Sequence, residues 1–286
     1  MDLLLIAGVS GSGKSVALAA LEDSGYYAVS NLPSTQLAGL LAHLKAVRQQ
    51  RVAIVLDVKT TPDLNGVATA IEVARADGWT VRFLYLDAKT DTLVKRFSET
   101  RRRHPFSDDT RTLKEAIEFE RSRLTDVRSL GYSFDTSDLS ASALRAWIKD
   151  LISVDPSKLT LLFQSFGFKH GVPLDADLVF DVRCLPNPHY EPNLAPQTGL
   201  DAAVISYLER PPQSERMYAD IHHFITSWLP DYARDNRNYL TVAIGCTGGQ
   251  HRSVYLVERL ARAFADRYQV QTRHRELATG DAPALR

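Results

Sequence analysis

The sequence predicts an α/β protein of two domains, of which the first is a parallel β-sheet that carries a P-loop. Short apolar runs alternate with helical patterns through the first half of the chain, as is typical of parallel strands joined by crossover helices. The glycine-rich segment 8–15 lies between the first such run and the first helical pattern. The alternation restarts after the linker-like segment 153–157. With 286 residues the chain is long enough for two domains, which we expect at 1–154 and 155–286.

In the first domain, each expected strand is a short run rich in apolar and β-branched residues. Each expected helix repeats its apolar residues every three or four positions. We expect strands at 3–7, 26–29, 52–57, 81–87 and 132–136. We expect helices at 16–21, 63–76 and 141–152, and a mostly helical, charge-rich segment at 91–125.

The second domain shows the same two patterns with a long interruption. We expect strands at 159–166, 178–182 and 239–244, and helices at 218–228 and 254–268. The interruption, 184–200, contains four prolines and two asparagines, which predicts a long ordered loop or a flexible lid.

The composition excludes several classes of protein. The chain has 34 basic and 34 acidic residues, so a protein that coats nucleic acid by charge alone is not expected. Its two cysteines, Cys184 and Cys246, exclude a disulfide framework and suit a reducing cytosol. No apolar run approaches the ~20 residues of a membrane helix. We therefore expect a cytoplasmic protein without membrane association.

The segment 8–15 matches the P-loop pattern G-x-x-x-x-G-K-[ST] at every fixed position. Its glycines let successive N–H groups face the phosphates at a helix N-terminus. Lys14 adds a positive charge near the β- and γ-phosphates, and the Ser15 hydroxyl suits Mg²⁺. We therefore expect ATP or GTP with Mg²⁺; the alternative is a glycine-rich turn without a ligand. The expected nucleotide-binding residues are Gly8, Gly11, Ser12, Gly13, Lys14, Ser15 and Asp57.

A P-loop also needs a carboxylate near the metal, usually at the end of a neighbouring strand. Asp57 and Asp87 both end apolar strands, and we prefer Asp57 because 52–56 is the more uniformly apolar run. The alternative is that either aspartate, Asp87 above all, simply caps the following segment. Lys14 and Asp57 are then the expected catalytic residues, and Ser15 and Asp57 the expected metal ligands. Neither aspartate is followed by a glutamate to align an attacking water, which predicts slow hydrolysis.

The arginine run at 101–103 has two interpretations of equal weight. It can close over the phosphates as a lid that stabilises negative charge during phosphoryl transfer. It can equally be a solvated helix end, since runs of charge usually lie on the surface.

A second glycine loop follows the expected strand 239–244 and precedes a helix. Backbone amides at that helix N-terminus, together with Arg252, suit a phosphate monoester. The loop also contains C-x-x-G-x-x-R-[ST], the pattern of cysteine-dependent phosphatases, with Cys246 as the nucleophile. Two features weaken that interpretation: Gly245 stands where such enzymes usually have histidine, and only Asp231 suggests itself as a general acid. We favour phosphate binding without covalent chemistry over catalysis, and catalysis over a turn with an inert cysteine.

Polar residues near the proline-rich loop are expected to converge on this second loop. Asp181 and Arg183 lie at a strand end, and His189 lies within 184–200. An anion seat with a few such partners suits a sugar phosphate.

Eight motifs of the chain together resemble the RapZ/YvcJ family of bacterial P-loop nucleotide-binding proteins. They lie at 8–15, 31–33, 101–105, 135–137, 166–171, 181–183, 185–188 and 245–254, so that the resemblance covers nearly the whole chain. It implies a kinase-like P-loop domain joined to a C-terminal α/β domain with a phosphofructokinase-like fold. It also implies binding of ATP and GTP, weak hydrolysis, and a homo-oligomer.

For the C-terminal domain the resemblance implies a sensor and an adapter. Members of the adapter branch sense glucosamine-6-phosphate and present small RNAs to an endoribonuclease. The implied sugar-phosphate site consists of Asp181, Arg183, His189, Cys246, Thr247, Gly248 and Arg252. This assignment implies a binding cysteine, and so disfavours the phosphatase interpretation.

The chain departs from the family pattern at two places. Ser30 stands where the family usually has aspartate before Asn-Leu-Pro, which puts an acidic or metal role there in doubt. The last ten residues contain one arginine and one acid, whereas the adapter branch ends in a basic tail. The remaining basic residues lie upstream, at Arg259, Arg262, Arg267, Arg273, His274 and Arg275.

Three other classes stay open at this point. A small-molecule kinase would use Lys14, Asp57 and the arginine run. A phosphatase would use Cys246. An RNA-binding adapter with a vestigial P-loop would bind RNA irrespective of nucleotide and with a steep dependence on salt.

Overall fold

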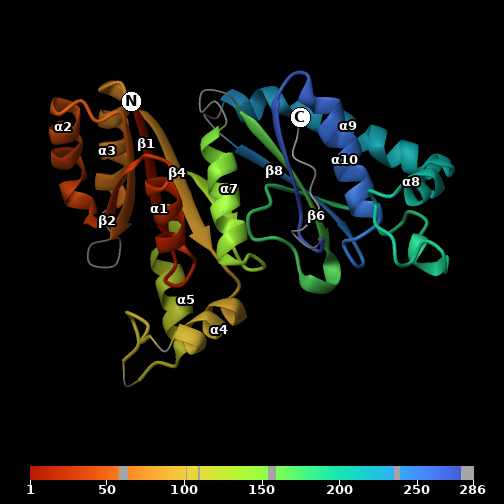
Figure 1. The fold of residues 1–286 in the computed structure, drawn as a ribbon, viewed down its shortest axis with the longest axis horizontal. Coiled ribbons are helices and arrows are strands. Elements are labelled where there is room, and N and C mark those ends of the chain that lie inside the picture. The colour runs from red at the N-terminus through yellow and green to blue at the C-terminus, as the bar shows by residue number, and fades with distance from the viewer. Residues whose placement is uncertain (58–63, 101, 109, 154–158, 235–238, 278–286) are drawn as a thin grey trace. The chain divides into compact units, whose positions relative to one another are not determined.

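The computed structural model describes the chain except for residues 58–63, 101, 109, 154–158, 235–238 and 278–286 (Figure 1). It divides into two compact units, Met1–Ser157 and Lys158–Arg286. The domain boundary expected between residues 154 and 155 lies outside the described residues.

The first unit contains a five-stranded, wholly parallel sheet with the strand order β2-β3-β1-β4-β5. Its strands are β1 (Asp2–Gly8), β2 (Tyr27–Pro33), β3 (Arg51–Asp57), β4 (Thr80–Asp87) and β5 (Tyr132–Asp135). Its helices are α1 (Lys14–Glu22), η1 (Ser34–Gln36), α2 (Leu37–Ala46), α3 (Leu64–Ala76), α4 (Thr90–Thr100), α5 (Leu113–Arg123), α6 (Thr125–Arg128) and α7 (Ala141–Ser153). The predicted parallel α/β fold is confirmed. Helix α2 has no counterpart among the predicted elements.

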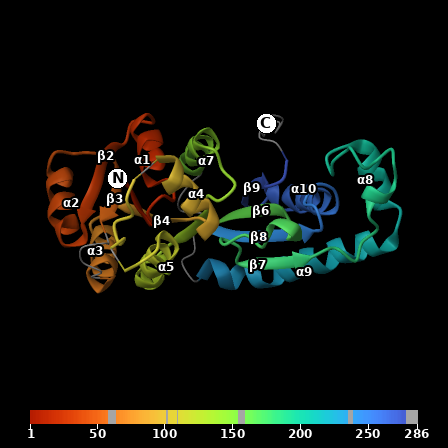
Figure 2. The ribbon, with the colours of Figure 1, turned by 90° about the horizontal axis from the view of Figure 1, so that it is seen from below.

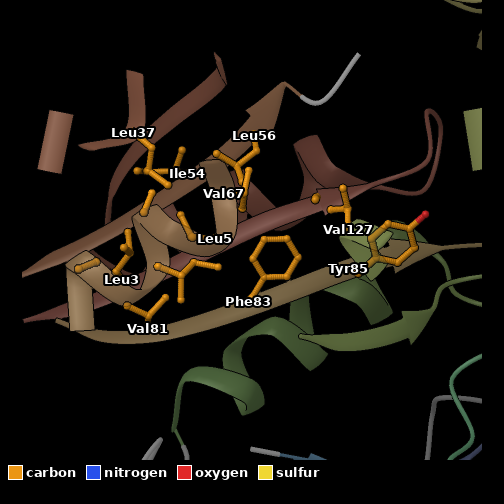
Figure 3. Packing of buried hydrophobic residues seen from close by; sticks show 14 of the residues in the cluster. Leu3, Leu5, Leu37, Ile54, Leu56, Val67, Val81, Phe83, Tyr85 and Val127 are labelled. Atoms are coloured by element: carbon orange, nitrogen blue, oxygen red, sulfur yellow. The ribbon is translucent and has the colours of Figure 1, made fainter. Parts of the chain in front are cut away.

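The central strand β1 explains why the N-terminal apolar run is so uniform. Leu3, Leu4, Leu5 and Ile6 are all fully buried, so both faces of β1 are covered. Figure 3 shows part of the core on one face, where Leu5 of β1, Ile54 of β3 and Phe83 of β4 pack together. Burying each such side chain contributes about 1.5–3 kcal/mol. Because β1 lies between β3 and β4, the ends of both neighbours adjoin the P-loop.

The second unit contains a four-stranded parallel sheet with the order β7-β8-β6-β9, visible as a stack of strands in Figure 2. Its strands are β6 (Thr160–Gly167), β7 (Leu178–Asp181), β8 (Tyr239–Cys246) and β9 (Gln269–His274). Its helices are η2 (Phe168–His170), η3 (Pro188–Tyr190), α8 (Ala202–Glu209), α9 (Pro212–Arg234) and α10 (Arg252–Ala265).

Three elements of this unit differ from expectation. Helix α8 and strand β9 were not predicted, and α9 extends well beyond 218–228 at both ends. Strand β9 is an edge strand whose six residues are all half-buried, so it lacks the apolar run that marks a central strand.

The proline-rich segment 184–200 is an ordered loop that packs on the second glycine loop. The Gly199 N–H donates to the Gln250 carbonyl at 2.8 Å. An added Cβ at Gly199 would stand 2.3 Å from the His251 carbonyl oxygen, so only glycine permits this close approach.

Within the described part of the chain, no helix has the length and apolar character that a bilayer span requires.

Candidate functional site

The P-loop curls between β1 and α1 with three glycines at positive φ. Gly8, Gly11 and Gly13 have φ of 142°, 83° and 100°, which other residues rarely adopt. At Gly8 an added Cβ would stand 2.0 Å from the Leu86 carbonyl oxygen. The same oxygen accepts a hydrogen bond from the Val9 N–H at 3.2 Å. The end of β4 therefore fixes the curl of the loop.

Lys14 and the start of α1 give the loop its positive potential. The Lys14 Nζ donates to the carbonyl oxygens of Gly8 at 2.6 Å and Val9 at 3.0 Å, so the ammonium lies against the loop itself. Gly13 is the N-cap of α1 and supplies no side-chain cap. The first N–H groups of the helix are therefore suited to a phosphate or another external acceptor.

A buried glutamate from α5 adjoins this loop. The Glu120 carboxylate accepts hydrogen bonds from the Ser10 N–H at 2.7 Å and the Ser10 hydroxyl at 2.8 Å, and its Oε2 lies 3.1 Å from His104 Nε2. Burial by itself raises the pKa of Glu120, but His104, the Lys14 charge and the Ser10 donors bring that pKa below its ordinary value. Glu120 is therefore a carboxylate anion beside the P-loop.

Helix α5 presents Glu120 because its first turn is fixed. Thr112 and Glu115 form a capping box in which each side chain accepts the other's backbone N–H. Such a cap stabilises a helix by about 1 kcal/mol. Ala116, Ile117 and Glu120 then share the buried face of the helix, one turn apart.

The two strand-end aspartates have different surroundings. Asp87 is buried, accepts the Ala88 N–H at 2.8 Å, and pairs with the Arg121 guanidinium at 3.2 Å and 3.3 Å. Asp57 is half-buried at the end of β3, which pairs directly with β1. Asp87 is thus held in an ion pair with Arg121, and the choice of Asp57 as the metal-binding carboxylate stays a prediction.

Ser15 and Asp57 fit a magnesium ion by donor type. Ser15 is exposed in the first turn of α1, and Asp57 ends the strand beside β1. Hydroxyl and carboxylate oxygens are the ligands that Mg²⁺ prefers.

The arginine run is tied to the P-loop through its neighbour in sequence. Arg102 and Arg103 are exposed, and Arg101 lies outside the described residues. His104, directly after them, is 2% exposed and holds Glu120. The choice between a lid and a solvated helix end therefore stays open, but the base of the run is anchored at the nucleotide loop.

The second glycine loop joins β8 to α10 and begins with a buried thiol. Cys246 Sγ lies 3.2 Å from the Ser253 hydroxyl oxygen and accepts the Gly249 N–H at 3.2 Å. Burial by itself raises the pKa of the Cys246 thiol, but these hydrogen bonds and the Arg252 charge bring that pKa below its ordinary value.

Arg252, the first residue of α10, links this loop to the end of β7. Its Nη1 donates to the carbonyl oxygens of Arg183 at 2.8 Å and Leu185 at 3.0 Å, and its Nη2 donates to Thr247 Oγ1 at 3.2 Å. Among the described residues, its buried Nε has no hydrogen-bond partner.

Charged side chains surround the mouth of the loop. Asp181 and Arg183 form a bidentate ion pair with contacts of 2.7–3.0 Å. Hydrogen bonds from Arg183, and the charge of Arg252, hold the pKa of Asp181 below its ordinary value. An added Cβ at Gly248 would stand 4.0 Å from Lys169 Nζ, so an ammonium group lies over the loop.

His189 reaches the same region from the proline-rich loop. Its ring lies 6.5 Å from that of His251, measured between centroids. His251 belongs to the glycine loop, and burial lowers the pKa of its imidazole.

The structure thus gathers two separate sets of predicted residues. The P-loop residues lie around the start of α1, and Asp181, Arg183, Cys246, Thr247, Gly248 and Arg252 lie around the start of α10, with His189 beside His251. Glu120, His104, Lys169 and Ser253 also lie at these loops but were not among the predicted site residues, although Ser253 ends the C-x-x-G-x-x-R-[ST] pattern. The His104–Pro105 and Lys169–His170 pairs are within the family motifs, whereas nothing in the sequence pattern marks Glu120.

Comparison with known proteins gives matches over both units. Residues 1–155 match a family model described as the RapZ-like N-terminal domain, and residues 159–278 match one described as the RapZ C-terminal domain. "Nucleotide-binding protein azo0399" of Azoarcus sp. (strain BH72) is 57% identical over 286 residues, which are 99% of this chain and 98% of that protein. A "Nucleotide-binding protein" of Thiobacillus denitrificans is 58% identical over 278 residues, 97% of this chain and 100% of the relative.

Solved structures resemble the chain more distantly. A crystal structure of shikimate kinase from Bacteroides thetaiotaomicron covers 54% of this chain and 99% of its own, with 13% identity and a TM-score of 0.34.

Proposed function

The chain belongs to the RapZ family, and from that premise we propose that it is a nucleotide-binding regulatory protein that senses an amino-sugar phosphate. The nucleotide binds at the P-loop of the first unit, and the sugar phosphate binds at the glycine loop of the second. The observation that carries the proposal is the presence of two glycine loops, each at a helix N-terminus beside a cation.

The P-loop supports binding of ATP or GTP. The positive φ of Gly11 and Gly13 turns the loop around an anion, and Lys14 is already held over it. Magnesium, when bound, neutralises phosphate charge, and Ser15 and Asp57 are the residues that would hold it. The names of the relatives, which are nucleotide-binding proteins, support the same assignment.

Weak hydrolysis is the activity that these residues support. Lys14 stabilises charge on the phosphates, which is the larger part of catalysis in this class of reaction. The Glu120 carboxylate is hydrogen-bonded to the P-loop, but its two oxygens are engaged by Ser10 and His104. It is therefore poorly placed to activate water, which favours a switch over a rapid enzyme.

The second loop supports binding of glucosamine-6-phosphate. Arg252, Thr247 and the amides at the start of α10 suit the phosphate group, and Lys169 adds a second cation. Asp181, held as a carboxylate, suits the amine of an amino sugar. The combination of an anion seat and a carboxylate distinguishes an amino-sugar phosphate from a plain sugar phosphate.

The partners in this proposal come from the family. We infer that the sugar phosphate, by binding one of two states of the C-terminal unit, controls the presentation of small RNAs to an endoribonuclease. The protein acts in this proposal as a homo-oligomer in the cytoplasm. A local basic group at the end of the last helix, which includes the exposed Arg262 and Arg267, is the candidate RNA contact in place of a basic tail.

Calorimetric titration of the full chain tests both sites together. Wild type, Lys14→Ala and Arg252→Ala are each titrated with ATP, GTP and glucosamine-6-phosphate, with glucosamine and glucose-6-phosphate as controls. We expect Lys14→Ala to lose only the nucleotide and Arg252→Ala to lose only the sugar phosphate. Loss of both ligands in either variant would contradict two independent sites.

A comparison of the affinities for glucose-6-phosphate and glucosamine-6-phosphate tests the role of Asp181. If the Asp181 carboxylate binds the amine of the sugar, wild type binds glucose-6-phosphate more weakly than glucosamine-6-phosphate. Asp181→Asn then removes that preference. Equal binding of the two sugars by wild type would remove the amino sugar from the proposal and leave a general sugar-phosphate site.

A further inference from the structure

The loop between β8 and α10 carries the groups for covalent chemistry as well as for binding. Residues 246–253 follow the pattern C-x₅-R-S, with the thiol at the end of a strand and the arginine at the start of a helix. We propose that Cys246 is a nucleophile that accepts a phosphoryl group from a phosphate ester or acyl phosphate whose leaving group is a weakly basic oxyanion. This inference rests on the anion site proposed above.

The contacts of Cys246 are those that stabilise a thiolate. The Gly249 N–H and the Ser253 hydroxyl both lie 3.2 Å from Sγ, and Ser253 itself is fully buried. The Gly249 N–H donates to this buried sulfur, and the Ser253 hydroxyl is within reach to donate to it once it is a thiolate; the lowered pKa of the thiol agrees with this geometry. A thiolate at the end of β8 is the attacking group that such a reaction needs.

In the part of the chain that the structure describes, Arg252 has one donor, Nε, without an acceptor, whereas both its Nη1 and its Nη2 are hydrogen-bonded. Its Nη1 is used by two carbonyl oxygens of residues 183 and 185, whereas the buried Nε has no partner among the described residues. A buried donor without an acceptor is rare and costly in folded proteins. A phosphate oxygen would satisfy it, and the second N–H of Nη2, beside the one donated to Thr247, would complete the planar fork that binds such an anion with two hydrogen bonds.

Packing explains why residue 245, directly before Cys246, is glycine. An added Cβ at Gly245 would stand 2.4 Å from Phe166 Cζ and 2.5 Å from Phe168 Cε2. The histidine usual at this position in cysteine-dependent phosphatases therefore has no room here. Ser253, Gly249 and Arg252 supply the stabilisation of the thiolate without it.

The acid needed for a poor leaving group is not supplied by either candidate aspartate. Asp231 lies near the end of α9, which leads into the start of β8, while Cys246 is at the far end of that strand. The eight residues of β8 span about 25 Å. Asp181 is near the loop but is held ionised by Arg183. The leaving group must therefore depart as an oxyanion, which selects aryl and acyl phosphates.

The proposed reaction has two steps, transfer of the phosphoryl group to Cys246 and hydrolysis of the adduct. In the first, Sγ forms a bond to phosphorus while the bond from phosphorus to the leaving oxygen breaks, and that oxygen departs with the electron pair. In the second, water attacks phosphorus and the sulfur–phosphorus bond breaks, which regenerates the thiolate and releases phosphate and a proton to solvent. Arg252 and the amides of the loop hold the equatorial oxygens in both steps.

Hydrolysis of p-nitrophenyl phosphate by the full chain tests the proposal, with acid quenching and mass spectrometry of the peptide that contains Cys246. We expect release of p-nitrophenol and a phosphoryl adduct on Cys246. Cys246→Ser is expected to abolish both, and Ser253→Ala to lower the rate about tenfold or more. Cys184→Ser is the matched control, because Cys184 is the other cysteine and is exposed; it is expected to behave as wild type.

Phosphate and glucosamine-6-phosphate binding, measured on the same samples, separates the two proposals. Binding by wild type without p-nitrophenol release and without an adduct would overturn the nucleophile and leave the sensor intact. Absence of anion binding by wild type would overturn both. Activity that persists in Cys246→Ser would also overturn the nucleophile, and thermal unfolding of that variant shows whether a loss of activity is a loss of folding.

Discussion

The Glu120 carboxylate accepts a hydrogen bond from the Ser10 N–H, with 2.7 Å between Oε2 and the nitrogen. Ser10 belongs to the P-loop and Glu120 to α5, 110 positions away in the sequence. Amides of this loop are the groups that attract phosphate, and one of them is engaged by an internal anion. Because the Lys14 charge also acts on Glu120, a bound nucleotide has to share its cation with that carboxylate.

We expect Glu120→Gln to bind nucleotide more tightly than wild type. The amide keeps an oxygen acceptor for Ser10 but removes a negative charge near Lys14. Removing one like charge from such a site is worth about 1 kcal/mol, or roughly fivefold in the dissociation constant. Calorimetry with ATP and GTP measures the change.

Glu72→Gln is the control for this variant. Glu72 is an exposed glutamate of α3 in the same unit, paired only with Arg75 at the surface in the described structure. It is expected to leave nucleotide affinity unchanged. Weaker binding by Glu120→Gln would show instead that the carboxylate helps to hold the liganded loop.

The stability of the first unit is expected to fall at acid pH through Glu120. The pKa of Glu120 in the folded protein lies below the value of about 4.3 expected when unfolded. Its stabilising effect is therefore fully present above about pH 5 and is lost as the pH falls through the folded pKa. The difference in unfolding free energy between wild type and Glu120→Gln should narrow as the pH falls below 5.

Urea unfolding followed by tryptophan fluorescence measures that difference. Of the three tryptophans, Trp79 and Trp147 belong to the first unit and Trp228 to the second. A Trp228→Phe background therefore confines the fluorescence change to the unit that contains Glu120. A difference that stays constant between pH 7 and pH 4 would argue against an ionised Glu120.

Gly8→Ala is expected to destabilise the first unit strongly. Its Cβ would stand 2.0 Å from the Leu86 carbonyl oxygen, and the φ of 142° is strained for any side chain. We expect a loss of about 3 kcal/mol or more. Gly39→Ala is the control: Gly39 is exposed on α2 with nothing within 4 Å of an added Cβ, and we expect a gain of about 0.5–1 kcal/mol. Thermal unfolding measures both effects: the melting temperature should fall in Gly8→Ala and rise in Gly39→Ala.

Gly248→Ala is expected to weaken sugar-phosphate binding without unfolding the second unit. The nearest atom to its added Cβ is Lys169 Nζ at 4.0 Å, so the methyl group occupies the space that the anion would use. We expect a loss of about tenfold or more in affinity for glucosamine-6-phosphate, with an unchanged melting temperature. Lys169→Ala should weaken binding as well, and more so at low salt. Unchanged affinity in Gly248→Ala would place the phosphate elsewhere.

Central strands were predictable because burial on both faces leaves a continuous apolar run. Residues 3–7 of β1 show this plainly, and the prediction of a parallel α/β fold is confirmed. The edge strand β9 was not predicted, because its half-buried positions accept polar residues such as Gln269 and Arg273. Helix α9 extends beyond the predicted 218–228 at both ends, and Pro230, a residue that usually disfavours a helix interior, lies within it. The phosphofructokinase-like fold of the second unit stays a prediction.

The sequence by itself determined the two glycine loops and the cations beside them. A P-loop depends on residues that are neighbours in sequence, such as Gly13 and Lys14, and on the strand and helix that flank them. A local pattern is therefore enough to predict it. Only the tertiary structure decided which distant groups meet at each loop. Glu120 reaches Ser10 through the packing of α5, and Arg252 reaches the end of β7 through the register of that strand with β8. Such contacts depend on how helices and strands pack across long stretches of chain, and no local pattern encodes them.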